Sequence, residues 1–312
     1  MERHEVVSFF SGCGGLDLGL VGDFSFLGKH YKRNPFEIIL ANDINEKATL
    51  TQKHNFKNIN VICDDVIELV KKDLPSADVL LGGFPCQDFS LAGKQKGLEV
   101  ERGNLYMSMI EGLKKIKPKV FLAENVKGLL SWKNGLAIQK MVKDFEGCGY
   151  NVEYRVMNAA DFGVPQMRER VIIIGVRKDI KKEFKWPMPT HSEKWVSVEE
   201  AIKDLEDEKV AVSLANHQYS KAKKNKGQGN KAVIADRPAP TMRAEHHGNI
   251  EFHYKLPRRL SAREAARIQS FPDNFEFLQS TSDAYRQIGN AVAPVFAWHL
   301  AQSLLEVLKT NE

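Results

Sequence analysis

The stretch Gly82-Gly-Phe-Pro-Cys-Gln-Asp-Phe-Ser90 follows a short apolar run, Asp78 to Leu81, which predicts a buried parallel strand. Ligand crevices of open α/β sheets lie at the carboxyl ends of such strands, so this turn is expected at a binding site. Pro85 fixes its own φ and favours an extended conformation at Phe84, which holds Cys86 on a stiff loop. Cys86 is therefore a candidate nucleophile, and the alternative is a small, buried, unreactive thiol.

Composition predicts a globular protein located in the cytoplasm. The 312 residues suffice for one large domain or two ordinary ones, with 43% hydrophobic and 27% charged content. No window approaches about 18 consecutive apolar residues, and the first residues lack the apolar core of a signal peptide. Neither a metal site nor a disulfide framework is expected, because no CxxC spacing or nearby ligand accompanies the four cysteines, Cys13, Cys63, Cys86 and Cys148.

Positive charge gathers in one part of the chain. Between His217 and Arg258, nine Lys or Arg residues accompany three acidic ones, a net charge of +6, whereas the whole chain carries +5. This segment predicts a polyanion partner, and a solvated basic surface is the alternative.

The N-terminal segment has the pattern of a nucleoside-binding unit. Val6 to Phe10 predicts a strand, and Ser11-Gly-Cys-Gly-Gly15 predicts a turn that lets the backbone approach a ligand before a helix begins at Leu16. The glycines do not follow GxGxxG spacing. An uncharged or cationic nucleoside is therefore favoured over a dinucleotide phosphate.

Two aspartates follow the next strands. The strand Glu37 to Ala41 leads to Asp43, which is placed to accept hydrogen bonds from ribose hydroxyls. The strand Asn60 to Cys63 leads to Asp65, a candidate partner for an adenine amino group. For both, a solvated loop carboxylate is the alternative.

The rest of the chain continues the α/β pattern. Glu124 is expected just beyond a buried strand, Lys119 to Leu122, where a carboxylate without a hydrogen-bonding role would be costly. Cys86 and Glu124 should therefore meet at one rim. Further elements are predicted as strands over Tyr150 to Met157 and Val171 to Val176, and as helices over Leu105 to Lys117, Ala262 to Ser270, and from Ile288 to about Leu308.

Six motifs occur in a characteristic order: FSGCGGLDLG, GGFPCQDFSLAGKQKG, AENVKGLL, QMRERVIIIGVR, RRLSAREAARIQSFPD and IGNAV. In this the chain resembles the cytosine-5 DNA methyltransferases of bacterial restriction-modification systems. The resemblance implies an α/β fold, with a Rossmann-like, mostly parallel catalytic and cofactor-binding domain over residues 1–185. It also implies a small, loop-rich target-recognition domain over 186–257 and a segment, 258–312, that returns to the catalytic domain.

The resemblance further implies S-adenosyl-L-methionine as cofactor, with S-adenosyl-L-homocysteine as product, and no metal. Phe10 would stack on the adenine. The implied cofactor-binding residues are Phe10, Ser11, Gly12, Cys13, Gly14, Gly15, Asp43, Ile44, Asp65, Val66, Pro85, Leu105, Asn290 and Val292.

In the catalytic part, the family implies that Cys86 attacks C6 of a flipped-out cytosine. Glu124 would hold N3 and the exocyclic amino group, Arg170 would contact O2, and Arg168 is a further candidate in the same neighbourhood.

Double-stranded DNA is the implied partner, read by a monomer at a short site, and the resemblance leaves room for a cognate restriction endonuclease. A polar loop after Cys86 would close over the flipped base. The DNA-contacting candidates are Ser90, Lys94, Gln95, Thr241, Arg243, His246 and His247. Of these, Arg243, His246 and His247 are candidates for reading bases, with a solvated surface residue as the alternative for each.

Two other readings stay open on the sequence. An RNA (tRNA) cytosine-5 methyltransferase uses similar motifs, but the RNA-directed branch carries a Cys-Phe-Thr element in its variable region, and this chain has no cysteine after Cys148. A catalytically silent DNA-binding protein belongs to another class. The presence of Cys86, Glu124 and Arg170 argues against that reading.

Overall fold

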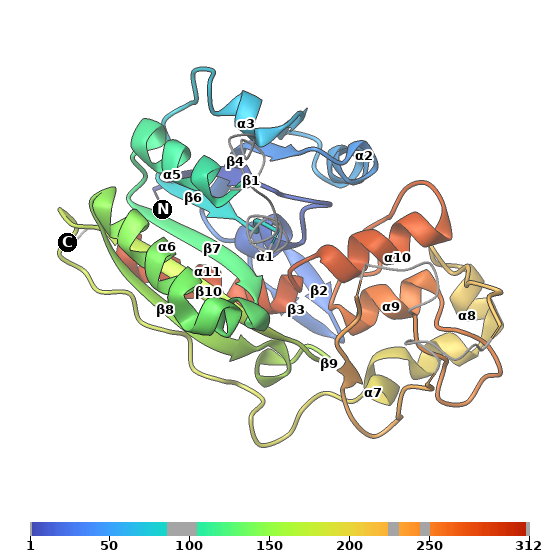
Figure 1. Ribbon diagram of the computed structural model, residues 1–312. Coiled ribbons are helices and arrows are strands. Elements are labelled where there is room, and N and C mark those ends of the chain that lie inside the picture. The colour runs from blue at the N-terminus through green and yellow to red at the C-terminus, as the bar shows by residue number, and fades with distance from the viewer. Residues whose placement is uncertain (1, 86–104, 224–230, 244–249, 310–312) are drawn as a thin grey trace.

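A seven-stranded sheet forms the centre of the molecule, with strand order β5-β4-β1-β6-β7-β10-β8 (Figure 1). The computed structural model describes residues 2–85, 105–223, 231–243 and 250–309. Within this sheet β10 runs antiparallel to both its neighbours, and the other strands are parallel to one another. The predicted mostly parallel α/β fold is therefore confirmed. The strands are β1 (His4–Phe9), β4 (Phe36–Asp43), β5 (Asn60–Cys63), β6 (Val79–Gly82), β7 (Val120–Val126), β8 (Tyr150–Asn158) and β10 (Glu169–Arg177).

Helices cover both faces of this sheet. Successive strand residues point to opposite faces, so Val6 packs in one core cluster and Val7 in the other. Because the central strands are buried on both faces of the sheet, their sequences are continuous apolar runs. One face carries α1 (Gly15–Val21) and α11 (Pro294–Leu308), and the other carries α3 (Val66–Leu69), α5 (Leu105–Ile116) and α6 (Leu136–Gly147).

A second lobe has its own core and lies beside the sheet in Figure 1. Its core joins residues of the 198–250 region to residues of α9 and α10, whereas α11 packs on the sheet. The C-terminal segment thus contributes to both parts, and the division at 186 and 257 stays a prediction. The lobe contains α7 (Val198–Ile202), α8 (Glu208–Val212), α9 (Ala262–Ile268) and α10 (Thr281–Asn290).

Several predicted elements differ from the structure. The predicted final helix is confirmed to its end at Leu308, but its predicted start at Ile288 is wrong. Helix α10 ends at Asn290, and α11 begins at Pro294, whose ring suits the first turn of a helix. Most of α10 lies in the polar stretch before Ile288, where no element was predicted. Strand β7 also extends beyond Leu122, so Glu124 lies inside a strand. The segment after α1, for which no element was predicted, forms a hairpin of β2 (Phe24–Phe26) and β3 (Lys29–Tyr31).

The span Thr281–Leu308 is the one helical stretch in the described chain that is long and apolar enough to cross a membrane. Most of its apolar window, 72%, is buried inside the protein, as in a core helix.

Candidate active site

A crevice of about 510 Å³ opens at the carboxyl ends of β1 and β6. The direction in which successive strands are added to the sheet reverses between β1 and β6. After β1 the chain adds β4 and β5 on one side, and after β6 it adds β7 on the other. Ligands of open α/β sheets bind at such a reversal. The crevice is lined by residues from the turn after β1, the ends of β4 and β5, the turn after β6, β7, the start of β10 and the end of α10.

Asp43 organises the glycine turn at the mouth of the crevice. Its Oδ2 accepts a hydrogen bond from the backbone N–H of Gly12 and its Oδ1 one from Asn45, both at 2.8 Å. Burial raises the pKa of the Asp43 carboxyl above its ordinary value. Two oxygens offer about four acceptor positions, so the carboxylate can still accept from a ligand hydroxyl.

Most of the implied cofactor-binding residues line this crevice. Gly14 and Gly15 do not, and both have packing roles. A Cβ at Gly14, where φ is +90°, would stand 2.7 Å from the Phe56 ring, and one at Gly15 would stand 2.5 Å from the Val292 carbonyl oxygen. The lining positions are Phe10, Ser11, Gly12, Cys13, Asp43, Ile44, Asp65, Val66, Pro85, Leu105, Asn290 and Val292.

Cys13 lines the crevice but is buried. Burial raises the pKa of its thiol to about 12, so this cysteine is not a nucleophile at neutral pH.

Glu124 and Arg170 form an ion pair in the same crevice, with Arg170 Nε 2.8 Å from Glu124 Oε1. Their side chains are only 12% and 11% exposed. The register of β7 and β10 explains this ion pair. Glu124 in β7 lies opposite Ile172 in β10, and Arg170 lies two residues from Ile172, so its side chain is on the same face of the sheet as that of Glu124. A nearly buried carboxylate and guanidinium thus present a fixed donor and acceptor to a ligand.

The turn that leads to Cys86 enters this crevice. Asn125 donates from Nδ2 to the carbonyl oxygen of Phe84 at 2.9 Å, and a Cβ built on Gly83 would stand 3.6 Å from Glu124 Oε2. Pro85 itself lines the crevice. Cys86 lies outside the described residues, so its predicted position beside Glu124 stays a prediction.

Arg168 ties three chain segments together from a buried position. Its guanidinium donates to the carbonyl oxygens of Met242 at 3.3 Å, Gly289 at 3.0 Å and Ala291 at 2.9 Å. Burial, together with a smaller effect of the nearby charge of Arg170, lowers the pKa of this guanidinium to about 9. These contacts favour a positioning role over contact with a base.

Two glutamines complete a ring with Arg168. Gln166 accepts from the Met242 N–H at 3.1 Å and donates to Gln269, which donates to the Ala291 carbonyl oxygen at 2.6 Å. The ring, defined as Gln166, Arg168, Met242, Gln269 and Ala291, is buried throughout. It joins the second lobe at Met242 to the crevice wall at Ala291.

The DNA-contacting candidates are only partly described. Thr241 donates from Oγ1 to the Met167 carbonyl oxygen, and Arg243 is exposed at the end of a described segment. The remaining candidates, Ser90, Lys94, Gln95, His246 and His247, lie outside the described residues.

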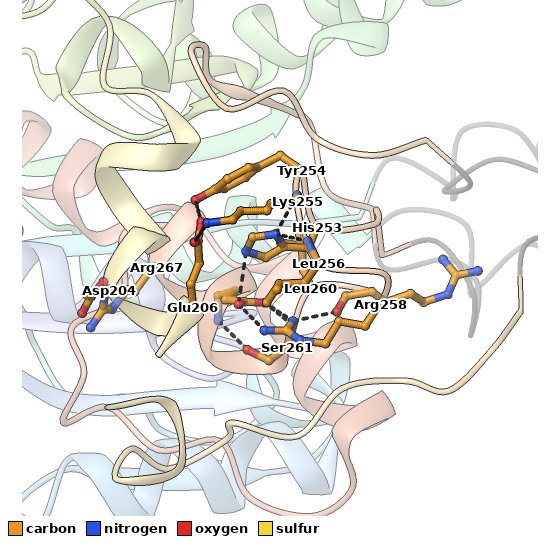
Figure 2. A network of polar contacts seen from close by, with 12 residues as sticks. Asp204, Glu206, His253, Tyr254, Lys255, Leu256, Arg258, Leu260, Ser261 and Arg267 are labelled. Atoms are coloured by element: carbon orange, nitrogen blue, oxygen red, sulfur yellow. Dashed lines mark hydrogen bonds and ion pairs between the residues drawn. The ribbon is translucent and has the colours of Figure 1, made fainter. Parts of the chain in front are cut away.

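Part of the basic segment is neutralised inside the second lobe (Figure 2). Arg258 donates to both carboxylate oxygens of buried Glu264, at 2.7 and 2.8 Å, and Lys255 pairs with Glu206. Glu264 also forms a capping box with Ser261 at the start of α9. Arg258 and Lys255 therefore hold the lobe together, and the charge available to a polyanion is smaller than the sequence count suggests.

Six polar residues of the crevice wall were not predicted. They are Ser8, Asn42, Asn45, Asn125, Arg286 and Gln287. Asn125 adjoins Glu124, and Arg286 and Gln287 directly precede the IGNAV motif, so proximity to a motif is the signal that points to them. In the described ranges, no group of three or more His, Cys, Asp or Glu side chains could hold a metal ion.

Comparison with known proteins gives consistent matches along the whole chain. The family model of C-5 cytosine-specific DNA methylases matches residues 4–306. Type II methyltransferase M.NgoFVII of Neisseria gonorrhoeae is 38% identical over 353 residues, covering 99% of this chain and 88% of that protein. Type II methyltransferase M.FnuDI of Fusobacterium nucleatum is 35% identical over 343 residues, covering 99% and 96%.

Solved structures share the fold. A protein described as a DNA modification methyltransferase encoded within a prophage (E. coli) has a TM-score of 0.74 and 26% identity, covering 98% of this chain and 99% of that one. The S. pombe Dnmt2 methyltransferase has a TM-score of 0.70 at 19% identity, covering 99% and 100%, and shows likeness of fold alone.

Proposed function

This chain belongs to the C-5 cytosine-specific DNA methylase family, and on that premise we propose how its own residues methylate cytosine. Cys86 is the nucleophile, Glu124 and Arg170 bind the target base, and S-adenosyl-L-methionine is the methyl donor. The observation that carries the proposal is the Glu124–Arg170 pair, which shares one crevice with the turn leading into Cys86.

The crevice fits the donor. Asp43 and Asp65 supply carboxylates at the ends of neighbouring parallel strands, where a ribose and an adenine amino group would be held. Phe10 and Ile44 add apolar surface at the same wall, and Ile44 is 71% exposed without a ligand. When bound, the donor supplies an activated methyl group on its sulfonium sulfur.

The chemistry of cytosine explains the catalytic residues. C5 is a poor nucleophile, and addition of the Cys86 thiolate to C6 pushes an electron pair through the ring to C5. C5 can then bond to the methyl group while the bond from that group to sulfur breaks, which leaves S-adenosyl-L-homocysteine. Glu124 shares a proton with N3 and Arg170 donates to O2, which stabilises the negative charge that develops on the ring. Loss of the C5 proton, which a water molecule can accept, then returns the electron pair to the ring and expels the thiolate.

Access to the base requires extrusion from the duplex, at a cost of roughly a few kcal/mol. Thr241, Arg243, His246 and His247 are proposed to contact the DNA from the recognition region. From the loop after Cys86, Ser90, Lys94 and Gln95 are proposed to close over the flipped base.

The relatives are named Type II methyltransferases. By analogy we infer that this protein acts as a monomer on a short duplex site in the cytoplasm, with a cognate restriction endonuclease as a candidate partner.

The substitution Cys86→Ser tests the proposal. Hydroxyl oxygen is a far weaker nucleophile than thiolate, so transfer of labelled methyl groups to bacterial genomic DNA should disappear. Binding of S-adenosyl-L-homocysteine, measured by calorimetry, should stay within about twofold of the wild type, a small change in free energy. Full methyl transfer by this variant would overturn the assignment of Cys86.

A further inference from the structure

Gln287 places an unpaired amide in the wall of the crevice. Its side chain belongs to α10 and is only 6% exposed, and neither Nε2 nor Oε1 has a hydrogen-bond partner among the described residues. A buried polar group without a partner is costly, so nearly all such groups in proteins are bonded. The position of Gln287 therefore points to a partner that enters the crevice.

Four other buried side-chain amides in this region form hydrogen bonds. Gln166 and Gln269 bond to each other and to backbone groups, and Asn125 bonds through both its oxygen and its nitrogen. Asn42 likewise donates to two carbonyl oxygens. Gln287 has no such bond, although it lines the same crevice as Asn42 and Asn125.

The neighbours of Gln287 locate it along the crevice. Its backbone oxygen lies 3.8 Å from the Cys13 sulfur, so Gln287 stands against the glycine turn after β1. Asn290 lies one helical turn later and lines the crevice too. Asp43 ends β4 and Asp65 follows β5, and these two strands lie on the opposite side of β1 from β6.

We propose that Gln287 binds the amino-acid end of the methyl donor. This inference rests on the proposed function, in which Asp43 and Asp65 hold the nucleoside end. The opposite end of the donor then extends past the glycine turn towards α10. It carries a carboxylate and an ammonium group, and a primary amide offers both a donor and an acceptor to match them.

Two ligands that differ only at this end provide the test. S-adenosyl-L-homocysteine carries the amino-acid end, and 5′-methylthioadenosine lacks it but keeps the adenosine and the thioether. Their dissociation constants should be measured by calorimetry on the full chain for the wild type, Gln287→Met and a control, Gln302→Met. Gln302 lies in α11 and bonds to Asn34, outside the crevice lining.

The expected result is selective. Gln287→Met should weaken S-adenosyl-L-homocysteine roughly tenfold or more, the loss typical of hydrogen bonds to charged groups. The same variant should leave 5′-methylthioadenosine within about twofold of the wild type. The melting temperature of ligand-free Gln287→Met should not fall, because methionine fills a similar volume and removes two unpaired polar atoms. Gln302→Met should leave both ligands unchanged.

Other outcomes separate this inference from the proposed function. Equal weakening of both ligands would mean that Gln287 supports the crevice as a whole and not the amino-acid end, and would overturn the inference. No weakening of either ligand would overturn it as well. Failure of the wild type to bind S-adenosyl-L-homocysteine would instead overturn the proposed cofactor, and this inference with it.

Discussion

For single residues, the sequence identifies side chains with reactive chemistry, and the fold determines which of these side chains contact one another. Glu124 and Arg170 were predicted from motifs separated by over forty residues, and the structure joins them at 2.8 Å through the register of β7 and β10. Gln287 could not be predicted in this way, because whether an amide is buried without a partner depends on what packs around it.

Glu124→Gln should lower kcat by roughly a hundredfold to a thousandfold, the usual loss when a charge-stabilising group is removed. The amide keeps the shape of the side chain but cannot supply the proton at N3. Methyl transfer to genomic DNA measures the effect, and S-adenosyl-L-homocysteine binding should stay unchanged. Glu169→Gln is the matched control, because Glu169 is a half-exposed carboxylate paired with Lys127, and it should keep full activity.

At the scale of elements, the strands and their order were largely predictable, and short or polar elements were not. The strand Asn60–Cys63 matches its prediction residue for residue, although it is an edge strand whose first and last residues are exposed. The predicted strand Val171 to Val176 lies inside β10, where all six of its residues are buried. The hairpin β2–β3 has strands of three residues, too short for a periodic pattern. Helix α10 was missed although Ser280 and Asp283 form a capping box, a signal that could have found it.

The ring around Arg168 joins elements that are distant in sequence. Arg168→Lys should lower the free energy of unfolding by about 2 kcal/mol, because an ammonium group cannot bridge the carbonyl oxygens that the guanidinium bridges. Urea unfolding followed by circular dichroism measures this. Arg3→Lys, at an ion pair where Arg3 is 80% exposed, should change stability by less than about 0.5 kcal/mol. Equal effects of the two substitutions would contradict a bridging role for Arg168.

At the scale of the whole molecule, the stability of the fold should depend on pH through His299 in α11. Burial lowers the pKa of His299 from 6.5 to about 4, so the unfolded chain binds a proton more readily than the folded one. This contribution to stability is complete above about pH 6.5 and is lost as the pH falls towards 4. Asp17 acts in the opposite direction, since burial raises its pKa to about 6 and its contribution grows as the pH falls.

Comparison of the wild type with His299→Gln isolates the histidine, because Asp17 is common to both proteins. The free energy of unfolding of the wild type minus that of the variant should decrease by about 3 kcal/mol between pH 6.5 and pH 4. Denaturant unfolding at a series of pH values measures it. If this difference in the free energy of unfolding stayed constant between pH 6.5 and pH 4, burial would not lower the pKa of His299.

Cys86 is proposed to bond to C6 of the cytosine that Glu124 and Arg170 hold. DNA that contains 5-fluorocytosine can capture this covalent intermediate. A fluorine at C5 cannot leave as a cation, so DNA with 5-fluorocytosine in place of cytosine should stay attached to the protein when S-adenosyl-L-methionine is present. We expect a complex that survives denaturing gel electrophoresis, with the DNA on the peptide that contains Cys86, and none with Cys86→Ser. Methylation of ordinary DNA without any adduct on the fluorinated DNA, or an adduct on another residue, would contradict the claim.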